Sequence, residues 1–177
     1  MSKSGSISEF LNTNRVVILD GGLATELEAR GAKLDDDLWS ARLLSEAPDL
    51  IEQVHYDYFV AGADVATSAS YQATFQGFQR RGLSEKQVED LLQLSVSLAQ
   101  DACSRFWKEF SGQPNRLRPL VAASIGSYGA CLADGSEFRG DYGLSLGELM
   151  DFHGPRLAIL ANSSASLLAC ETIPCFI

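Results

Sequence analysis

Two carboxylates and two adjacent glycines are the residues best suited to chemistry in this 177-residue sequence. Asp20 ends a short apolar run and is followed by Gly21 and Gly22, and Glu171 ends another run near the last residue. Carboxylates hold an ammonium group through charge-assisted hydrogen bonds, and glycine N–H groups that lead into a helix can hold a carboxylate. With Ser68 after a third run, these residues predict a pocket for the zwitterionic head of an amino acid.

Each of these residues also has a purely structural interpretation. Asp20 with its two glycines is equally typical of a turn closed by an Asx hydrogen bond. Ser68 could be a hydrogen-bonded polar group inside a protein core. The sequence after Asp20, GGLATE, lacks the G-x-G-x-x-G spacing of a dinucleotide loop, and no P-loop motif occurs in the chain. His55 falls on the apolar face of a predicted helix, which indicates a structural histidine.

The runs that precede these residues are predicted to be strands. Their composition and flanking turn residues indicate strands at 15–20, 63–70, 119–126 and 166–170. Helical spacing of apolar residues predicts helices from residue 23, over 48–62, over 84–110 with a capping box at Ser84 and Gln87, and over 144–160. Gly154 and Pro155 are expected to disturb the last of these helices.

This alternation predicts an α/β fold with parallel strands joined by right-handed crossovers. Two architectures fit: the first half, about four βα units, of a (β/α)₈ TIM-type barrel, or a small doubly wound sheet of the flavodoxin type. In both, the carboxyl ends of the strands carry the site. Residues 1–14 are interpreted as a flexible N-terminus, and residues 15–177 as one partial barrel domain, truncated after its fourth strand.

Composition excludes several function classes. The chain has 14 basic and 23 acidic residues, a net charge of −9, with no basic block for phosphate neutralisation, so we expect no nucleic acid partner. No apolar run approaches the roughly 20 residues that cross a bilayer, and no secretory signal is visible, so we expect no membrane partner and a cytoplasmic location. Cys103, Cys131, Cys170 and Cys175 are too widely spaced for a disulfide framework and are weak indicators of a metal site.

Five blocks, taken in order, resemble a known family. They are DGGLATELEARG, DDDLWSA, AGADVATSASYQAT, VAASIGSYGACLADGSEFRG and ETIP, from about Arg15 to the last residue, and they resemble the homocysteine S-methyltransferases. The resemblance implies a (β/α)₈ barrel that moves a methyl group from a sulfonium donor, S-methylmethionine or S-adenosylmethionine, to homocysteine and gives methionine. It also implies a zinc ion, held by three cysteines, that binds the homocysteine sulfur as a thiolate, the nucleophilic form.

Matching motifs carry family roles onto particular residues. The resemblance implies that Asp20 and Gly21, with the adjoining Gly22, contact the homocysteine head group, that Ser68 supplies a hydroxyl, and that Glu171 pairs with the ammonium. The family's zinc cysteines would lie beyond residue 177, so no metal ligand is assigned in this chain.

The chain is therefore expected to be a fragment that is inactive alone. A non-catalytic homocysteine-binding protein without metal is the alternative, and an unrelated enzyme acting on a phosphorylated substrate is a third. Two segments, ANSSAS and HGPR, depart from the family pattern and put the third crossover helix in doubt.

Overall fold

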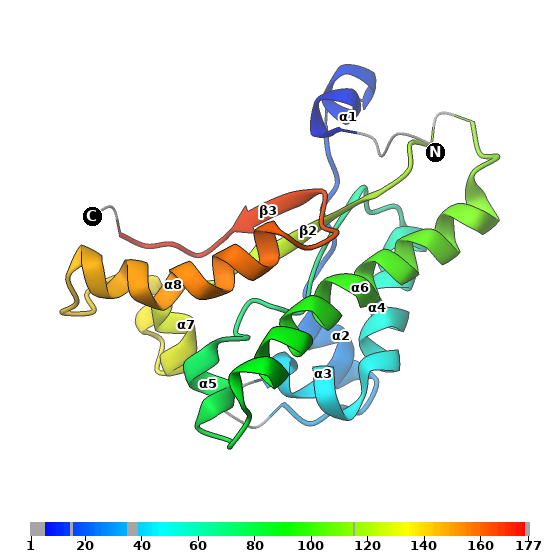
Figure 1. The fold of residues 1–177 in the computed structure, drawn as a ribbon. Coiled ribbons are helices and arrows are strands. Elements are labelled where there is room, and N and C mark those ends of the chain that lie inside the picture. The colour runs from blue at the N-terminus through cyan, green and yellow to red at the C-terminus, as the bar shows by residue number, and fades with distance from the viewer. Residues whose placement is uncertain (1–5, 15, 35–38, 115, 176–177) are drawn as a thin grey trace.

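A three-stranded parallel sheet forms the centre of the chain. The computed structural model describes residues 6–14, 16–34, 39–114 and 116–175. Its strands are β1 (Val65–Thr67), β2 (Leu120–Ile125) and β3 (Leu167–Cys170), in that order across the sheet (Figure 1). The chain is therefore of the α/β class with a parallel sheet, as the sequence predicts.

Helices connect the strands and cover the sheet. They are α1 (Ile7–Asn14), α2 (Leu23–Ala29), α3 (Leu43–Glu46), α4 (Pro48–Ala61), α5 (Phe75–Gln79), α6 (Glu85–Phe110), α7 (Tyr128–Leu132) and α8 (Leu146–Ala161), with 3-10 turns η1 (Trp39–Arg42) and η2 (Ser136–Phe138). Helix α4 packs along α6, and α6 and α8 contact each other and β2 (Figure 1). None of the helices in the described part of the chain is long and apolar enough to cross a membrane.

Alternate residues of β2 face two different apolar clusters. Val121, Ala123 and Ile125 belong to the main core with the helices, whereas Leu120 and Ala122 pack with Phe10 of α1 on the other face. Every residue of β2 is therefore buried, which explains why its residues are apolar except for Ser124. The sequence analysis assigns residues 1–14 to a flexible N-terminus, but residues 7–14 form α1, and its Phe10 is fully buried.

The strand predicted over 15–20 forms only in part. Residue 15 lies outside the described residues, and the segment 16–20 makes a single isolated parallel bridge, between Leu19 and Val65. The N–H of Asp20 donates to the carbonyl of Val65 (2.9 Å), and the N–H of Asp64 donates to the carbonyl of Ile18 (2.7 Å). The segment thus runs beside β1 as a fourth, weakly paired strand.

Helix α8 is continuous, contrary to the doubt that Gly154 and Pro155 raised. Ser145 and Glu148 form a capping box at its start, and the helix runs through Pro155 to Ala161. A proline inside a helix removes one backbone hydrogen bond and crowds the preceding turn. The next residue, Arg156, is buried and donates to backbone carbonyls outside the helix, so tertiary contacts hold the helix across the break.

A partly buried ion pair fastens the amino ends of the first strands. Arg116 donates to Asp64 Oδ1 (2.9 Å) and to the carbonyls of Ala63 (2.6 Å) and Gly62 (3.2 Å). Asp64 Oδ2 accepts the N–H of Ile18 (3.0 Å). The carboxylate of Asp64 therefore joins the segment 16–20 to the start of β1. The guanidinium of Arg116 joins Asp64 to the turn after α4.

His55 is fully buried in α4, as the structural interpretation requires. Neither ring nitrogen has a hydrogen-bond partner within the described residues. Burial disfavours the charged ring and lowers the pKa of His55 from 6.5 to about 4.

We expect the acid sensitivity of folding to depend on His55. Because its pKa is lower in the folded chain, its contribution to stability is complete above pH 6.5 and is lost as the pH falls toward 4. His55→Leu should therefore lose less stability than the unmodified chain over that window, as measured by urea denaturation at several pH values. Equal losses in the two proteins would contradict this assignment.

Candidate functional site

The candidate site lies at the carboxyl ends of the strands. Thr67 is the last residue of β1, Ser124 lies one residue before the end of β2, and Glu171 directly follows β3. The parallel register pairs Thr67 with Ala122 and Ser124 with Ala169. Side chains alternate between the faces of a sheet, so Thr67, Ser124 and Glu171 share one face, the face that carries Phe10 near the amino ends.

These side chains surround a cavity of about 300 Å³. Its lining residues are Gly21, Gly22, Leu23, Ala24, Thr25, Thr67, Ser68, Ala69, Tyr71, Ser124 and Glu171. Four of the five residues that the sequence analysis assigns to substrate binding therefore line one cavity. The fifth, Asp20, contacts the lining residue Thr67 and feels the charge of Glu171.

Asp20 is held by Thr67. The backbone N–H of Thr67 donates to Asp20 Oδ2 (2.8 Å), and its hydroxyl donates to Oδ1 (3.1 Å). Burial raises the pKa of Asp20 to about 6 against these hydrogen bonds, and the negative charge of Glu171 adds to the rise. The site therefore holds two carboxylates that repel each other, and a cation bound between them would offset this repulsion.

Serine hydroxyls link β2 to the loop after β1. Ser70 donates to the carbonyl of Ser124 (2.7 Å), so in the contact between the Ser68 and Ser70 hydroxyls (2.7 Å) Ser68 is the donor. Ser68 Oγ also accepts the N–H of Ser124 (3.1 Å). With its hydrogen committed, Ser68 can only accept from a ligand, which suits an ammonium and not a carboxylate.

Three residues of the site had no role assigned from the sequence. Ser124 donates to a carboxylate oxygen of Glu171, Thr67 holds Asp20, and the half-buried Tyr71 forms a wall of the cavity. The signal that could have identified Thr67 and Ser124 is period-two spacing, since both lie on the same face as the apolar Val65 and Ala122. Tyr71 lies in a loop, where spacing gives no such signal.

The cysteines do not fit a zinc site. No group of three or more His, Cys, Asp or Glu side chains gathers in the described residues. Cys103 donates to the carbonyl of Pro119 (3.3 Å), and Cys131 contacts the hydroxyl of Thr74 (3.2 Å). These thiols are used in local packing, on different elements from the two carboxylates.

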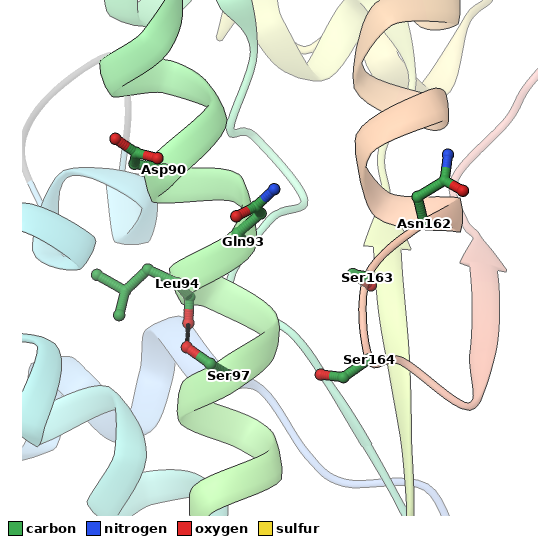
Figure 2. A pocket seen from close by; sticks show the side chains of 7 residues that line it. All are labelled: Asp90, Gln93, Leu94, Ser97, Asn162, Ser163 and Ser164. Atoms are coloured by element: carbon green, nitrogen blue, oxygen red, sulfur yellow. Dashed lines mark hydrogen bonds between the residues drawn. The ribbon is translucent and has the colours of Figure 1, made fainter.

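A larger hollow, of about 510 Å³, lies elsewhere and lacks these features. Figure 2 shows Asp90, Gln93, Leu94 and Ser97 of α6 on one side of it and the turn after α8, residues 162–164, on the other. That turn precedes β3, so the hollow lies toward the amino end of the strand. Its only carboxylate, Asp90, already pairs with Lys86. Ligands of parallel sheets bind beyond the carboxyl ends, which favours the cavity at Asp20 and Glu171.

Comparisons with known proteins agree on one family. The family model described as Homocysteine S-methyltransferase matches residues 17–177. Homocysteine S-methyltransferase YbgG of Bacillus subtilis is 55% identical over 169 residues, which cover 96% of this chain and 54% of the relative. The Homocysteine S-methyltransferase of Escherichia coli is 49% identical over 176 residues, 99% of this chain and 56% of the relative.

A solved structure shares the fold. The metallated form of the homocysteine methyltransferase MmuM from Escherichia coli superposes with a TM-score of 0.88 at 50% identity, covering 94% of this chain and 57% of that one. The chain therefore spans about half the length of the relatives that it matches.

We expect Asp20 to make the folded chain less stable as the pH rises. Its pKa of about 6 lies above the ordinary 3.8, so the stability that its protonated form gives is complete below pH 3.8 and is lost as the pH rises toward 6. Relative to the unmodified chain, Asp20→Asn should gain stability across this window, as measured by urea denaturation. Asp151→Asn, at an exposed position of α8, controls for loss of one negative charge, and an equal gain there would contradict the assignment.

Proposed function

Because the chain belongs to the homocysteine S-methyltransferase family, we propose that it supplies the homocysteine-binding half of an enzyme that methylates homocysteine to methionine. The observation that carries this proposal is the cavity at the carboxyl ends of parallel strands, which Glu171 lines and whose lining residue Thr67 holds Asp20. The proposed architecture is the first half of a (β/α)₈ barrel, with the segment 16–20, β1, β2 and β3 as its four strands.

The head group of homocysteine would bind between the two carboxylates and the glycines. Its ammonium would lie near Asp20 and Glu171, with Ser68 accepting one of its hydrogens. Its carboxylate would bind the N–H groups of Gly21 and Gly22, which donate to no backbone carbonyl in the described residues. A bound ammonium favours the ionised form of both carboxylates, so it would offset the repulsion that raises the pKa of Asp20.

Two hydroxyls orient the carboxylates for this contact. Thr67 donates to Asp20, and Ser124 donates to Glu171, so each carboxylate is fixed before the ligand arrives. Fixed groups lose little conformational freedom on binding. The cavity would then place the homocysteine sulfur away from the strand ends.

A free thiol has a pKa of about 8.5 and is mostly protonated at neutral pH, so methyl transfer needs a group that holds the sulfur as a thiolate. The residues that the structure describes do not form such a site. We propose that it comes from the half of the family barrel that this chain does not span, as does the contact surface for a sulfonium donor, S-methylmethionine or S-adenosylmethionine. A second candidate is a protein that binds homocysteine without methylating it, since the described residues contain no group of side chains that could hold a metal ion for the thiol.

We expect Glu171→Ala to weaken homocysteine binding by about 10- to 100-fold, the equivalent of one charge-assisted hydrogen bond of roughly 1.5–3 kcal/mol. Isothermal titration calorimetry of the purified chain with L-homocysteine measures this change. Glu89→Ala, at a partly exposed position of α6, is the matched control and should bind as the unmodified chain does. Equal affinity in the Glu171 variant would remove Glu171 from the site.

A chimera separates the two candidate functions. Residues 1–177 joined to the part of Bacillus subtilis YbgG that lies beyond the matched region should form methionine from homocysteine and S-methylmethionine. Residues 1–177 alone should form almost none, because the thiol then stays protonated. Ionising it costs about 1.4 kcal/mol for each unit by which its pKa exceeds the pH. An inactive but folded chimera that still binds homocysteine would favour the non-catalytic candidate. Turnover by residues 1–177 alone would contradict the proposal that thiol activation comes from elsewhere.

A further inference from the structure

Arg156 of α8 is a buried cation without a carboxylate partner. It is 1% exposed and is the largest of the fully buried side chains. No salt bridge joins it to an Asp or Glu in the described residues. Burial lowers its pKa to about 10, so it remains charged at neutral pH.

Its hydrogen bonds connect α8 to the two loops that follow β1 and β2. Nη1 donates to the carbonyls of Tyr71 (3.3 Å) and Ala73 (3.5 Å), and Nη2 donates to the carbonyl of Gly126 (2.6 Å). Nη2 also lies 3.1 Å from His153 Nδ1. An arginine guanidinium has only donors, so Nδ1 is the acceptor and the hydrogen of a neutral His153 is on Nε2.

A guanidinium suits this position because carbonyl groups from two loops converge there. A Cβ atom on Gly126 would lie 2.5 Å from the carbonyl oxygen of Tyr71, so only glycine allows the two loops to approach this closely. Carbonyl dipoles that point to the same place repel each other unless a donor lies between them. The planar fork of arginine satisfies several acceptors at once, which a lysine ammonium on its flexible chain does less well.

One of the two loops lines the candidate site, and the other directly follows the strand that carries Ser124. Tyr71 is a wall of the cavity, and Gly126 lies two residues after Ser124, which donates to Glu171. Through its hydrogen bonds to both loops, the side chain of Arg156 therefore makes the distance between Tyr71 and the carboxylate of Glu171 depend on where α8 lies. Burying an ion is costly, and apolar replacements are often no less stable, so packing alone does not account for an arginine here.

We infer that Arg156 is a positioning residue, which sets the width of the homocysteine cavity by holding the Tyr71 and Gly126 loops together. The identity of the ligand rests on the function proposed above, whereas the geometric role of Arg156 does not. An experiment that rejects the role of Arg156 and one that rejects homocysteine as the ligand therefore give different results.

The test compares the buried Arg156 with the partly buried Arg116, which lies at the opposite end of the same strands. Arg156→Met should raise the homocysteine Kd about tenfold or more, because a binding constellation tolerates little displacement, with the stoichiometry of binding unchanged. Arg116→Met removes a comparable set of carbonyl contacts at the amino ends, and should lower stability with no more than about a twofold change in Kd. A merely structural role for Arg156 predicts the opposite result, a smaller fraction of competent protein with an unaltered Kd.

A second variant and a ligand-free measurement complete the test. Arg156→Lys keeps the charge without the fork, so its Kd should also rise, and it serves if Arg156→Met does not fold. In amide NMR spectra without ligand, the signals of Tyr71, Gly126 and Glu171 should shift in the Arg156 variants and stay in place in Arg116→Met. Unchanged signals and an unchanged Kd in the folded Arg156 variants would overturn the inference. Shifted signals in a chain that does not bind homocysteine would support the inference and reject the proposed function.

Discussion

Parallel pairing of the strands is the constraint on which the candidate site depends. Asp20, Thr67, Ser124 and Glu171 are far apart in the sequence and meet only because each lies at the carboxyl end of its strand segment. The register matters as much as the direction, since a slip by one residue would turn each side chain to the opposite face of the sheet. The apolar residues Leu120 and Ala122, packed with Phe10, therefore help to specify the register that turns the polar side chains toward the cavity.

Two arginines fasten the two ends of this arrangement in different ways. At the amino ends, Arg116 pairs with the carboxylate of Asp64 and also binds carbonyls, so the charges compensate each other. At the carboxyl ends, Arg156 binds carbonyls and one histidine nitrogen only. The compensated pair lies away from the cavity, and the uncompensated cation lies beside it. A buried cation without a carboxylate partner is less stable than a compensated pair, and such local losses of stability are expected near functional sites.

The local parts of the fold follow from the sequence, whereas the non-local parts do not. The long helix α6 and its capping box at Ser84 and Gln87 are confirmed because capping is a matter of a few adjacent residues. The prediction for α8 was wrong about the disturbance at Pro155, because the stabilising contacts of Arg156 come from loops more than 25 residues away in the sequence. Four of the five predicted site residues line one cavity, and the fifth, Asp20, is hydrogen-bonded to its lining residue Thr67. The roles of Thr67 and Tyr71 depend on contacts that only the folded chain reveals.

The guanidinium of Arg156 does not pair with the two carboxylates of the site, and this affects which ligand the site can bind. Asp20 and Glu171 are anionic, and Arg156 is a cation held by the loops that border the same cavity. No salt bridge joins Arg156 to either site carboxylate in the part of the chain that the structure describes. If the guanidinium reached Glu171, it would neutralise that carboxylate and remove the attraction for an ammonium. In the described residues the guanidinium donates to the carbonyls of Tyr71 and Gly126 and forms no salt bridge with Glu171, so that carboxylate is left available to an ammonium.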